Sequence, residues 1–393
     1  MLHKIKKNFF LKRLYYLDWN IRKYFKYKLI ENSDIIINEK IKNKFKPVIY
    51  HKNINDNFYD DYNNIKFYKQ FYYVINNAYV VGPEAIGVTS QNEIIVDTAG
   101  GSINTLGQCS PKKFMYHKML KIDKTIDYAS VFITPYINGN NNNFFHWVIE
   151  CLLLIEGVIA YENNTGYRPK IIINHKPEKY QIDSLKLLGF NNEDIILWTY
   201  NKVLVKNLIV PACRLGIGKE KNLVNPESMF WLRKNMMSNI AVLTDDRHNI
   251  LISREGSKGR RFVNHSDIVK MLDEFNYKEY RLELLSEEEK IKLFSNARNI
   301  IGGHGAGLMN MMFCSNANVI AIICEDSTQV VNRSVRGIFK YLAISLEIDY
   351  YELFSEISYA NYLNANFKSS LKEYDLNVDL DKLKYLMIKS NMI

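Results

Sequence analysis

Residues Asn299 to Asn310 read NIIGGHGAGLMN, and this stretch decides the fold class of the chain. An apolar strand, Asn299–Ile301, runs into four glycines within six residues, arranged around one histidine. The apolar run Leu308–Phe313 that follows is typical of a helix. A strand, a glycine turn and a helix in this order place backbone N–H groups at the positive end of a helix, a geometry that binds phosphate. The stretch therefore predicts an α/β unit with a phosphate-bearing ligand, such as a nucleotide or nucleotide-sugar.

The spacing of these glycines departs from the dinucleotide fingerprint G-x-G-x-x-G. Gly303 and Gly305 would require a third glycine at position 308, which is Leu308. An acid, Glu325, lies 20 residues past Gly305 at the end of the next predicted strand, where Rossmann-like units bind a ribose. The pattern favours nucleotide binding over NAD binding. The alternatives are a tight turn selected for packing and, for His304, a structural histidine.

Strand and helix patterns alternate on both sides of the glycine turn, which predicts two α/β units with largely parallel sheets. An Asn-Pro pair begins the last helix of the first unit, and Ser286 with Glu289 forms a capping box in the second. We expect Asn264 to cap the helix that ends at Phe275. The predicted strands are 79–81, 93–97, 131–134, 170–174, 195–198, 203–210, 249–253, 299–301 and 319–323; the predicted helices are 144–160, 178–188, 226–237, 264–275, 286–298, 308–313 and 329–345.

The composition is that of a globular protein large enough for two domains. The chain has 393 residues, 47% of them hydrophobic and 24% charged. Its five cysteines form no CxxC pair, so a disulfide framework or a structural zinc site is not expected and a reducing cytoplasm fits best. The most apolar run, 151–160, is short and broken by Glu156, so we predict no membrane-spanning helix.

The net charge of +10 is concentrated at the N-terminus. Residues 1–30 contain nine Lys or Arg against one acid, Asp18, and an apolar stripe that includes Leu14, Leu17 and Ile21. A basic amphipathic helix of this kind suits an anionic membrane surface, which predicts peripheral binding at the inner face of a membrane. A solvated helix that packs its apolar stripe on the body is the alternative. Because the rest of the chain is close to neutral, we expect no nucleic-acid partner.

A first group of chemistry-bearing residues follows the predicted strand 249–253. Arg254 stands just past the carboxyl end of this strand, and Lys258, Arg260 and Arg261 follow it. Open α/β sheets bind ligands at that edge, and a guanidinium can hold a diphosphate with two parallel hydrogen bonds. The alternative is a solvated basic loop. The glycine turn about 50 residues later, in the same predicted sheet, favours the phosphate interpretation.

A second group opens the predicted helix at residue 144. His146 and Glu150 are four residues apart and therefore share one helix face, where an imidazole beside a carboxylate makes a general base. A partly buried histidine with a structural partner is the alternative. The metalloprotease pattern HExxH is missing from the sequence and no third ligand accompanies His146 and Glu150, so we predict no bound metal.

These blocks, in this order, resemble glycosyltransferase family 61, the DUF563 proteins. The matching blocks are Asn143-Phe144-Phe145-His146-Trp147 with Glu150, Ile252-Ser253-Arg254, Arg260-Arg261, Leu285-Ser286, Leu293-Phe294-Ser295, and Ile301 to Asn310 with Phe313. The family includes bacterial capsule-type enzymes, plant xylan xylosyl- and arabinosyltransferases, and animal O-linked N-acetylglucosamine transferases. The sequence departs from it at Ala321, where members often carry a glutamate, and in having only the basic N-terminal segment where animal and plant members carry a signal or an anchor.

The resemblance implies a GT-B-like fold, in which two Rossmann-like domains face each other across a cleft. It also implies metal-independent transfer with inversion, His146 or Glu150 being the catalytic base. The nucleotide-sugar, expected to be UDP-linked, is then held by the C-terminal domain, and no other cofactor is expected. The binding residues implied are Arg254, Arg260, Arg261, His304, Gly305, Ala306, Gly307, Leu308, Asn310 and Glu325.

The domains expected on this basis are a basic segment with its connector (1–45), an N-terminal acceptor domain (46–240), a nucleotide-sugar domain (241–350) and a partly helical tail (351–393). The function predicted is transfer of a sugar, a hexose or a pentose, to a polysaccharide, glycolipid or other glycan. Two other classes stay open, a different nucleotide-dependent enzyme such as an NAD oxidoreductase and an inactive membrane-associated binding protein.

Overall fold

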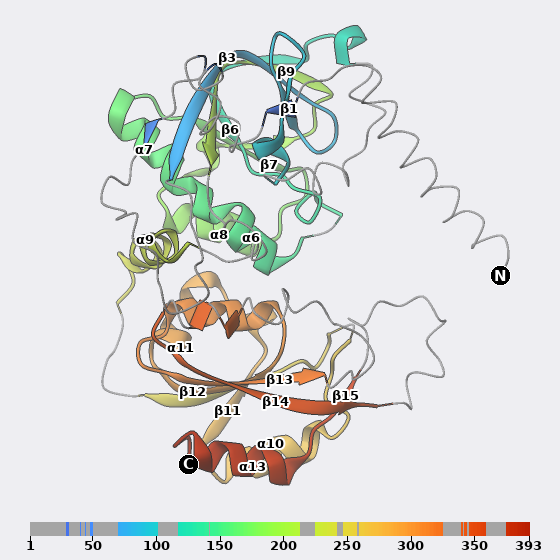
Figure 1. The fold of residues 1–393 in the computed structure, drawn as a ribbon, viewed down its shortest axis with the longest axis vertical. Coiled ribbons are helices and arrows are strands. Elements are labelled where there is room, and N and C mark those ends of the chain that lie inside the picture. Colours follow the sequence, from blue (N-terminus) through green and yellow to red (C-terminus); the bar gives the residue numbers. More distant parts are fainter. Residues whose placement is uncertain are drawn as a thin grey trace, which may run out of the picture. The chain divides into compact units, whose positions relative to one another are not determined.

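The computed structural model describes residues 70–100, 117–140, 142–212, 225–241, 247–257, 259–324, 339–340, 342–343, 346–358 and 375–393, with short pieces at 29–30, 40, 44 and 48–49. These residues form a mixed α/β structure with two sheets (Figure 1). The chain divides into two compact units, the first made of 1–181 and 189–214 and the second of 182–188 and 215–393. The basic N-terminal segment, apart from residues 29–30, and Glu325 lie outside the described residues.

The first unit contains a mixed sheet of nine strands, in the order β1-β5-β4-β3-β9-β6-β7-β8, with β2 paired to β3. Strands β6 to β9 run parallel, whereas β3 is antiparallel to β9 and to β4. The strands are β1 Leu29–Ile30, β2 Val48–Ile49, β3 Phe71–Val81, β4 Ile86–Val88, β5 Ile94–Ile95, β6 Lys124–Val131, β7 Lys170–Asn174, β8 Ile195–Trp198 and β9 Lys202–Ala212. Short 3-10 turns lie at η1 Val96–Ala99, η2 His117–Met119 and η4 Asn192–Asp194.

One long helical run covers this sheet: α6 Phe144–Glu150, η3 Leu152–Leu154 and α7 Ile155–Thr165. Helix α7 packs on β3 and β9. The run as a whole is long and apolar enough to cross a membrane, with a mean hydropathy of 1.7, although the sequence led us to expect no such helix. Because 72% of its most apolar window is buried within the structure, its environment is that of a core helix.

The second unit contains a six-stranded sheet in the order β11-β10-β12-β13-β14-β15, parallel except for β15. The chain passes from β10 to β11 on one side and then returns to place β12 on the other side of β10. The strand order therefore reverses between β10 and β12, and ligands of open α/β sheets bind at such a reversal. The strands are β10 His248–Ile252, β11 Tyr277–Tyr280, β12 Ala297–Gly303, β13 Asn318–Cys324, β14 Asp349–Ile357 and β15 Leu376–Asn377.

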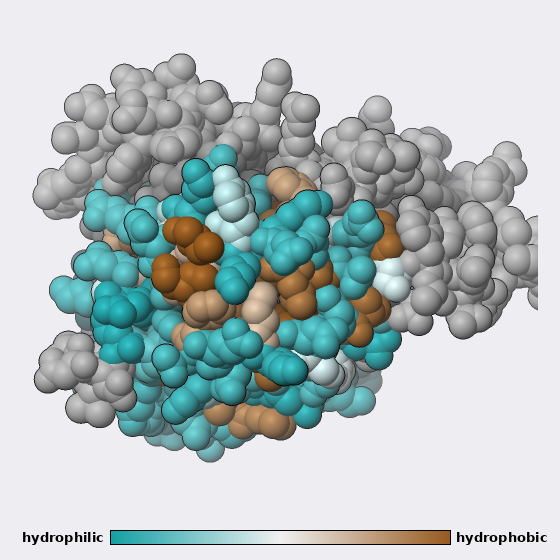
Figure 2. All heavy atoms as spheres, turned by 90° about the horizontal axis from the view of Figure 1, so that it is seen from below, coloured by the Kyte–Doolittle hydropathy of each residue, from teal (hydrophilic) through white to brown (hydrophobic). Residues whose placement is uncertain are grey.

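Helices lie on both faces of the second sheet, with α10 and α13 on one face and α11 on the other (Figure 1). Strand β13, Asn-Val-Ile-Ala-Ile-Ile-Cys, is almost entirely apolar, as expected for a strand of a sheet that helices cover on both faces. Seen from the side of α10 and α13, the surface is largely hydrophilic with apolar side chains among the polar ones (Figure 2). The helices are α9 Pro226–Met237, α10 His265–Asp273, η6 Leu282–Leu284, α11 Glu287–Ser295, η7 Ala306–Phe313 and α13 Leu380–Lys389, with α8 Lys179–Leu187 contributing most of its residues to this unit.

Local signals placed most elements well, and the capping box of Ser286 and Glu289 is confirmed. Several details differ from the predictions, among them the length of β3, which begins at Phe71 and not at residue 79. The strand expected at 131–134 ends at Val131, and the helix after the glycine turn is the 3-10 helix η7. Asn264 occupies the N-cap position of α10, but its side chain forms no capping hydrogen bond, because its amide forms two hydrogen bonds with the backbone of Val378, at 2.7 and 3.1 Å.

The described parts of the segment 351–393, residues 351–358 and 375–393, take part in the second sheet and its core. Strand β14 pairs along its length with β13, and the apolar residues Leu383 and Met387 of α13 are completely buried. Asp379 caps helix α13, because its side chain accepts a hydrogen bond from the backbone N–H of Lys382. The end of the chain therefore completes the hydrophobic core on the α10 side of the sheet.

Candidate functional site

The site in the second unit is built at the carboxyl ends of β10 and β12, where the strand order reverses. Strand β10 ends at Ile252 and leads into Arg254, while β12 ends at Gly303 and leads into His304. The two strands approach closely, since Ile252 pairs with Gly302 and a Cβ on Gly302 would lie 3.0 Å from that of Ile252. The sheet therefore brings together the stretch Arg254 to Arg261, called the arginine loop below, and the predicted glycine turn, Gly302 to Gly307.

The side chain of Arg254 lies across the glycine turn. A Cβ added at Gly303 would lie 2.6 Å from its Cδ, and one added at Gly305 would lie 2.6 Å from its Nη1. Gly305 has φ 170°, an extended conformation that any residue adopts, so its need for glycine comes from the room taken by Arg254. The other end of the guanidinium donates a hydrogen bond to the carbonyl of Gly259 at 2.9 Å.

A second guanidinium, that of Arg260, points at the same turn. Its Nη1 donates to the carbonyl of His304 at 2.6 Å. Arg260 has φ 57°, in the left-handed region that non-glycine residues avoid, and such strain is concentrated at functional positions. The backbone N–H of His304 donates to Ile322 at 2.8 Å, and its ring meets Phe339 edge-on. Hydrogen bonds at His304, one to β13 and one from Arg260, therefore fix the turn.

The electrostatics of this pair of arginines favour an anion. Burial, with the charge of Arg260 acting in the same direction, lowers the pKa of Arg254 to about 10, and burial also lowers the pKa of Arg260. The Nε atoms of both are buried and have no hydrogen-bond partner within the described part of the chain. Two desolvated like charges with unused donors are costly unless a negative group joins them. An anion at this position would offset that cost.

The remaining predicted residues of this group have structural partners. Arg261 forms an ion pair with the buried Asp375, with Nη2 2.7 Å from Oδ2 and Nε 3.2 Å from the same oxygen. Asn310 is buried and donates to the carbonyl of Gly307 at 2.9 Å, which supports the turn. Leu308 belongs to the core, whereas Ala306 and Gly307 are half-buried at the start of η7.

In the first unit, α6 places the predicted histidine and carboxylate side by side. Asn143 caps the helix by accepting hydrogen bonds from the backbone N–H groups of Phe145 and His146. One turn later, Glu150 Oε1 lies 2.8 Å from Nδ1 of His146, and Tyr136 stacks on the imidazole with ring centres 4.1 Å apart. The Nδ1 atom is therefore engaged, and Nε2 is the ring nitrogen left for an incoming group.

The two units offer these groups from separate places in the chain, and sequence reasoning missed some of their supports. Tyr136 stacks on His146 from the loop before α6, and Asp375 orders the arginine loop from the far end of the chain. No spacing relates Asp375 to Arg261, because 114 residues separate them. Tyr136 lies just before the Asn-rich loop 138–143, and an aromatic residue at that place only weakly indicates a role in the site.

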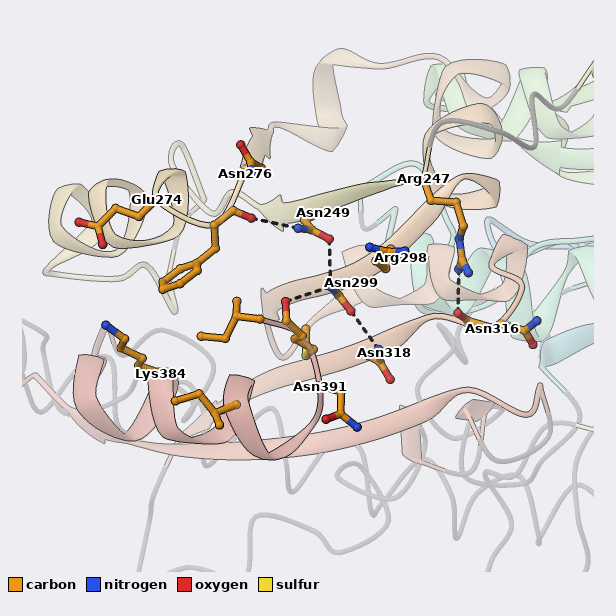
Figure 3. Close-up of a pocket in the computed structure, with 14 residues that line it drawn as sticks. Arg247, Asn249, Glu274, Asn276, Arg298, Asn299, Asn316, Asn318, Lys384 and Asn391 are labelled. Atoms are coloured by element: carbon orange, nitrogen blue, oxygen red, sulfur yellow. Dashed lines mark hydrogen bonds between the residues drawn. The ribbon is translucent and has the colours of Figure 1, made fainter.

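A depression of about 900 Å³ lies at the opposite edge of the second sheet, among the residues that begin β10, β12 and β13 (Figure 3). Its floor is a ladder of amides, in which Asn318 donates to Asn299 at 2.9 Å and Asn299 donates to Asn249 at 3.0 Å. The ladder ends on the carbonyl of Phe275. Because these amides bond one another and the backbone, we assign the depression to the structure of the sheet edge and place the chemistry at the arginine pair.

No curated protein sequence matches the chain. A family profile does, and its description is Glycosyltransferase 61. It matches residues 144–321, a segment that begins with α6 and ends within β13, so that it contains the His146–Glu150 pair, both buried arginines and the glycine turn. This match, which covers somewhat less than half of the chain, supports the resemblance to glycosyltransferase family 61, and at the level of the family it indicates a glycosyltransferase.

Proposed function

We propose that this protein is an inverting, metal-independent glycosyltransferase that uses a nucleotide-sugar, with UDP as the expected carrier. The observation that supports it most is the pair of buried guanidiniums of Arg254 and Arg260 at the glycine turn. Asp375, the carboxylate whose charge acts on Arg254, is itself paired with Arg261. A diphosphate supplies the negative charge and the acceptors that the two guanidiniums lack.

In the proposed reaction, an acceptor hydroxyl attacks the anomeric carbon of the donor sugar as the bond to the diphosphate breaks. Nε2 of His146 takes the hydroxyl proton, and Glu150 holds the imidazole and stabilises its positive charge. The leaving diphosphate gains charge during the step, and Arg254 and Arg260 stabilise that charge without a metal. The polysaccharide, glycolipid or other glycan that accepts the sugar is not specified by these residues.

The donor half of this proposal is tested by binding. We expect UDP or a UDP-sugar to raise the melting temperature of the protein more than GDP-, CMP- or dTDP-linked sugars or NADH. A ligand at 100 times its dissociation constant adds about 2.7 kcal/mol of stability. Arg254→Ala should lose the effect. Stabilisation by NADH alone would favour an oxidoreductase, and no stabilisation by any nucleotide-sugar would favour a binding protein without this chemistry.

The catalytic half is tested by turnover at saturating donor. His146→Ala and Glu150→Gln should each lower kcat at least about 100-fold, because loss of a general base or of its orienting carboxylate has effects of that size. Donor affinity should be unchanged. Glu162→Gln, on α7 of the same unit, is the matched control, since Glu162 pairs with the exposed Arg168. If neither first-named variant lowers kcat by that factor, the base is elsewhere.

The GT-B arrangement and the membrane association are part of the same proposal. The family resemblance supports the first, in which each unit supplies one wall of a cleft. Residues 1–30, with nine basic residues and one acid, support the second. Co-sedimentation with anionic liposomes should be strong for the full chain and lost when residues 1–30 are removed. Equal sedimentation of both proteins would refute peripheral binding through this segment and the expected place at the inner face of a membrane.

A further inference from the structure

Three side chains from three different elements converge beside the arginine loop. Glu255 follows β10, His265 is the first residue of α10, and Glu279 lies on β11. Nε2 of His265 lies 3.0 Å from Oε1 of Glu279 and 3.8 Å from Oε1 of Glu255. The three potential ligand atoms all lie within 4.8 Å of one another, and none of the three residues belongs to the site described above.

The contacts within this group are incomplete. His265 Nε2 and Glu279 Oε1 are both buried from solvent and have no hydrogen-bond partner within the described residues, although they are only 3.0 Å apart. The imidazole nitrogen therefore lies next to Oε1 of Glu279 without being aligned on it. The nearby Arg281 does not neutralise the pair, because it is engaged by Glu283 at 2.9 Å. Two carboxylates and an unaligned ring nitrogen concentrate negative charge and lone pairs at one point.

We propose that Glu255, His265 and Glu279 bind one divalent cation of the zinc class. Zinc–nitrogen and zinc–oxygen bonds of about 2.0–2.2 Å place tetrahedral ligands about 3.4 Å apart, close to the 3.0 and 3.8 Å seen here. Water completes the coordination. Imidazole favours Zn²⁺ and its neighbours, whereas Mg²⁺ prefers six oxygens, so Mg²⁺ should bind poorly.

The ion's role is to brace the loop and not to take part in transfer. Arg254 reaches from this loop toward the glycine turn after β12, while the adjacent Glu255 reaches toward α10 and β11. A cation at Glu255 therefore ties the loop to two elements on the other side of β10. This inference goes beyond the proposed function and holds whether or not the bound nucleotide is a UDP-sugar.

The test is a titration of the full chain with Co²⁺ after treatment with a chelator, since four-coordinate Co²⁺ reports its ligands through its visible absorption. We expect one Co²⁺ per chain, displaced by Zn²⁺ and not by Mg²⁺. Loss of partners that merely orient a ligand costs 10–100-fold in metal affinity, so loss of a ligand in His265→Gln or Glu279→Gln should cost at least about 100-fold. Glu283→Gln is the matched control and should bind as the unaltered protein does.

Two further measurements keep the proposal separate from folding and from donor binding. Glu255→Gln changes the most exposed of the three ligands, and should weaken Co²⁺ binding with the far-UV spectrum unchanged. Affinity for UDP at a saturating Zn²⁺ concentration should be unchanged in Glu283→Gln. Arg254→Ala should lose affinity for UDP but still bind Co²⁺. Absence of stoichiometric Co²⁺ binding, or equal binding by His265→Gln, would overturn the metal site and identify the group as an ion pair of a protonated histidine.

Discussion

At the residue scale, the function proposed for the second unit depends on how Arg254 is packed. Its Cδ atom lies over Gly303 and its guanidinium over Gly305, so a side chain at either position would collide with Arg254. Glycine was expected there to expose backbone N–H groups to phosphate. The structure adds that glycine also makes room for the cation that would bind the same phosphate.

A first prediction concerns the charge of Arg254. We expect Arg254→Gln to weaken UDP binding about 10- to 100-fold, since a hydrogen bond to a charged group contributes about 1.5–3 kcal/mol. We expect the free variant to be at least as stable as the unaltered protein, because a desolvated charge has been removed. Isothermal titration and thermal unfolding measure the two effects. A variant that is less stable and binds UDP normally would contradict both expectations.

The pH dependence of binding follows from the same residue. The pKa of Arg254 in the folded protein is lowered to about 10, so between about pH 10 and 12.5 the unfolded chain binds more protons than the native one, and Arg254 makes the free protein more stable as pH rises through this window. Anion binding has the opposite sign, because it needs the charged form. The dissociation constant for UDP should therefore increase as the pH rises through the pKa of Arg254, which is about 10. Its increase should be smaller in Arg254→Gln, which serves as the comparison at each pH.

A third prediction separates steric from conformational roles of glycine. Gly305→Ala should weaken UDP binding, with an effect near tenfold if the guanidinium moves by a few tenths of an ångström, while stability changes little because φ at this position suits alanine. Gly166→Ala is the reverse case. Gly166 has φ 76° with open space around it, so alanine should lower stability by about 1–2 kcal/mol without affecting binding. Denaturant unfolding and titration of both variants check the contrast.

At the element scale, the segment 375–378 is joined to the arginine loop by backbone and side-chain hydrogen bonds. The backbone N–H of Leu376 donates to Arg261 at 2.8 Å, and that of Val263 donates to Leu376 at 2.9 Å. The buried carboxylate of Asp375 accepts from both the backbone and the guanidinium of Arg261. These contacts fix the position of Arg261, and so restrain the preceding residue, Arg260, whose backbone is in the left-handed conformation.

A double-mutant cycle on Arg261→Gln and Asp375→Asn measures the coupling free energy between these two side chains. We expect each change alone to lower the free energy of unfolding, and the two together to fall short of additivity by about 0.5–3 kcal/mol. The lower part of that range is expected, because half of the Arg261 side chain is exposed and its charge is screened. UDP affinity should fall in Asp375→Asn as the loop loses its anchor. Strict additivity would show that the pair does not couple the two segments.

At the scale of the whole molecule, the second unit extends well beyond the segment that matches the family. That match ends at residue 321, whereas β14, β15 and α13 complete the sheet and the core. Each unit has its own hydrophobic cluster of buried side chains. The expected domain limits at 240 and 350 stay predictions, but the described part of 351–393 contributes a strand and a helix to the second unit.

The importance of α13 is tested with two positions on the same helix. Leu383 is completely buried, so Leu383→Ala should lower the free energy of unfolding by about 2–5 kcal/mol. Ile388 is 56% exposed, and Ile388→Ala should change it by about 0.5 kcal/mol or less. Urea unfolding followed by circular dichroism makes the comparison. Similar small effects at both positions would mean that the tail is dispensable for the unit.

The sequence by itself determined the α/β class, most strand and helix positions, the capping box at Ser286, the His146–Glu150 pair and the resemblance to the family. These features depend on residues close together in the chain, where periodicity, capping and glycine turns can be read directly. Only the tertiary structure decided which arginines face the turn, that Arg261 binds Asp375, that Asn264 holds Val378, and that Glu255, His265 and Glu279 meet. Those pairings depend on strand order and register across more than one element, and side chains brought together in that way leave no local pattern in the sequence.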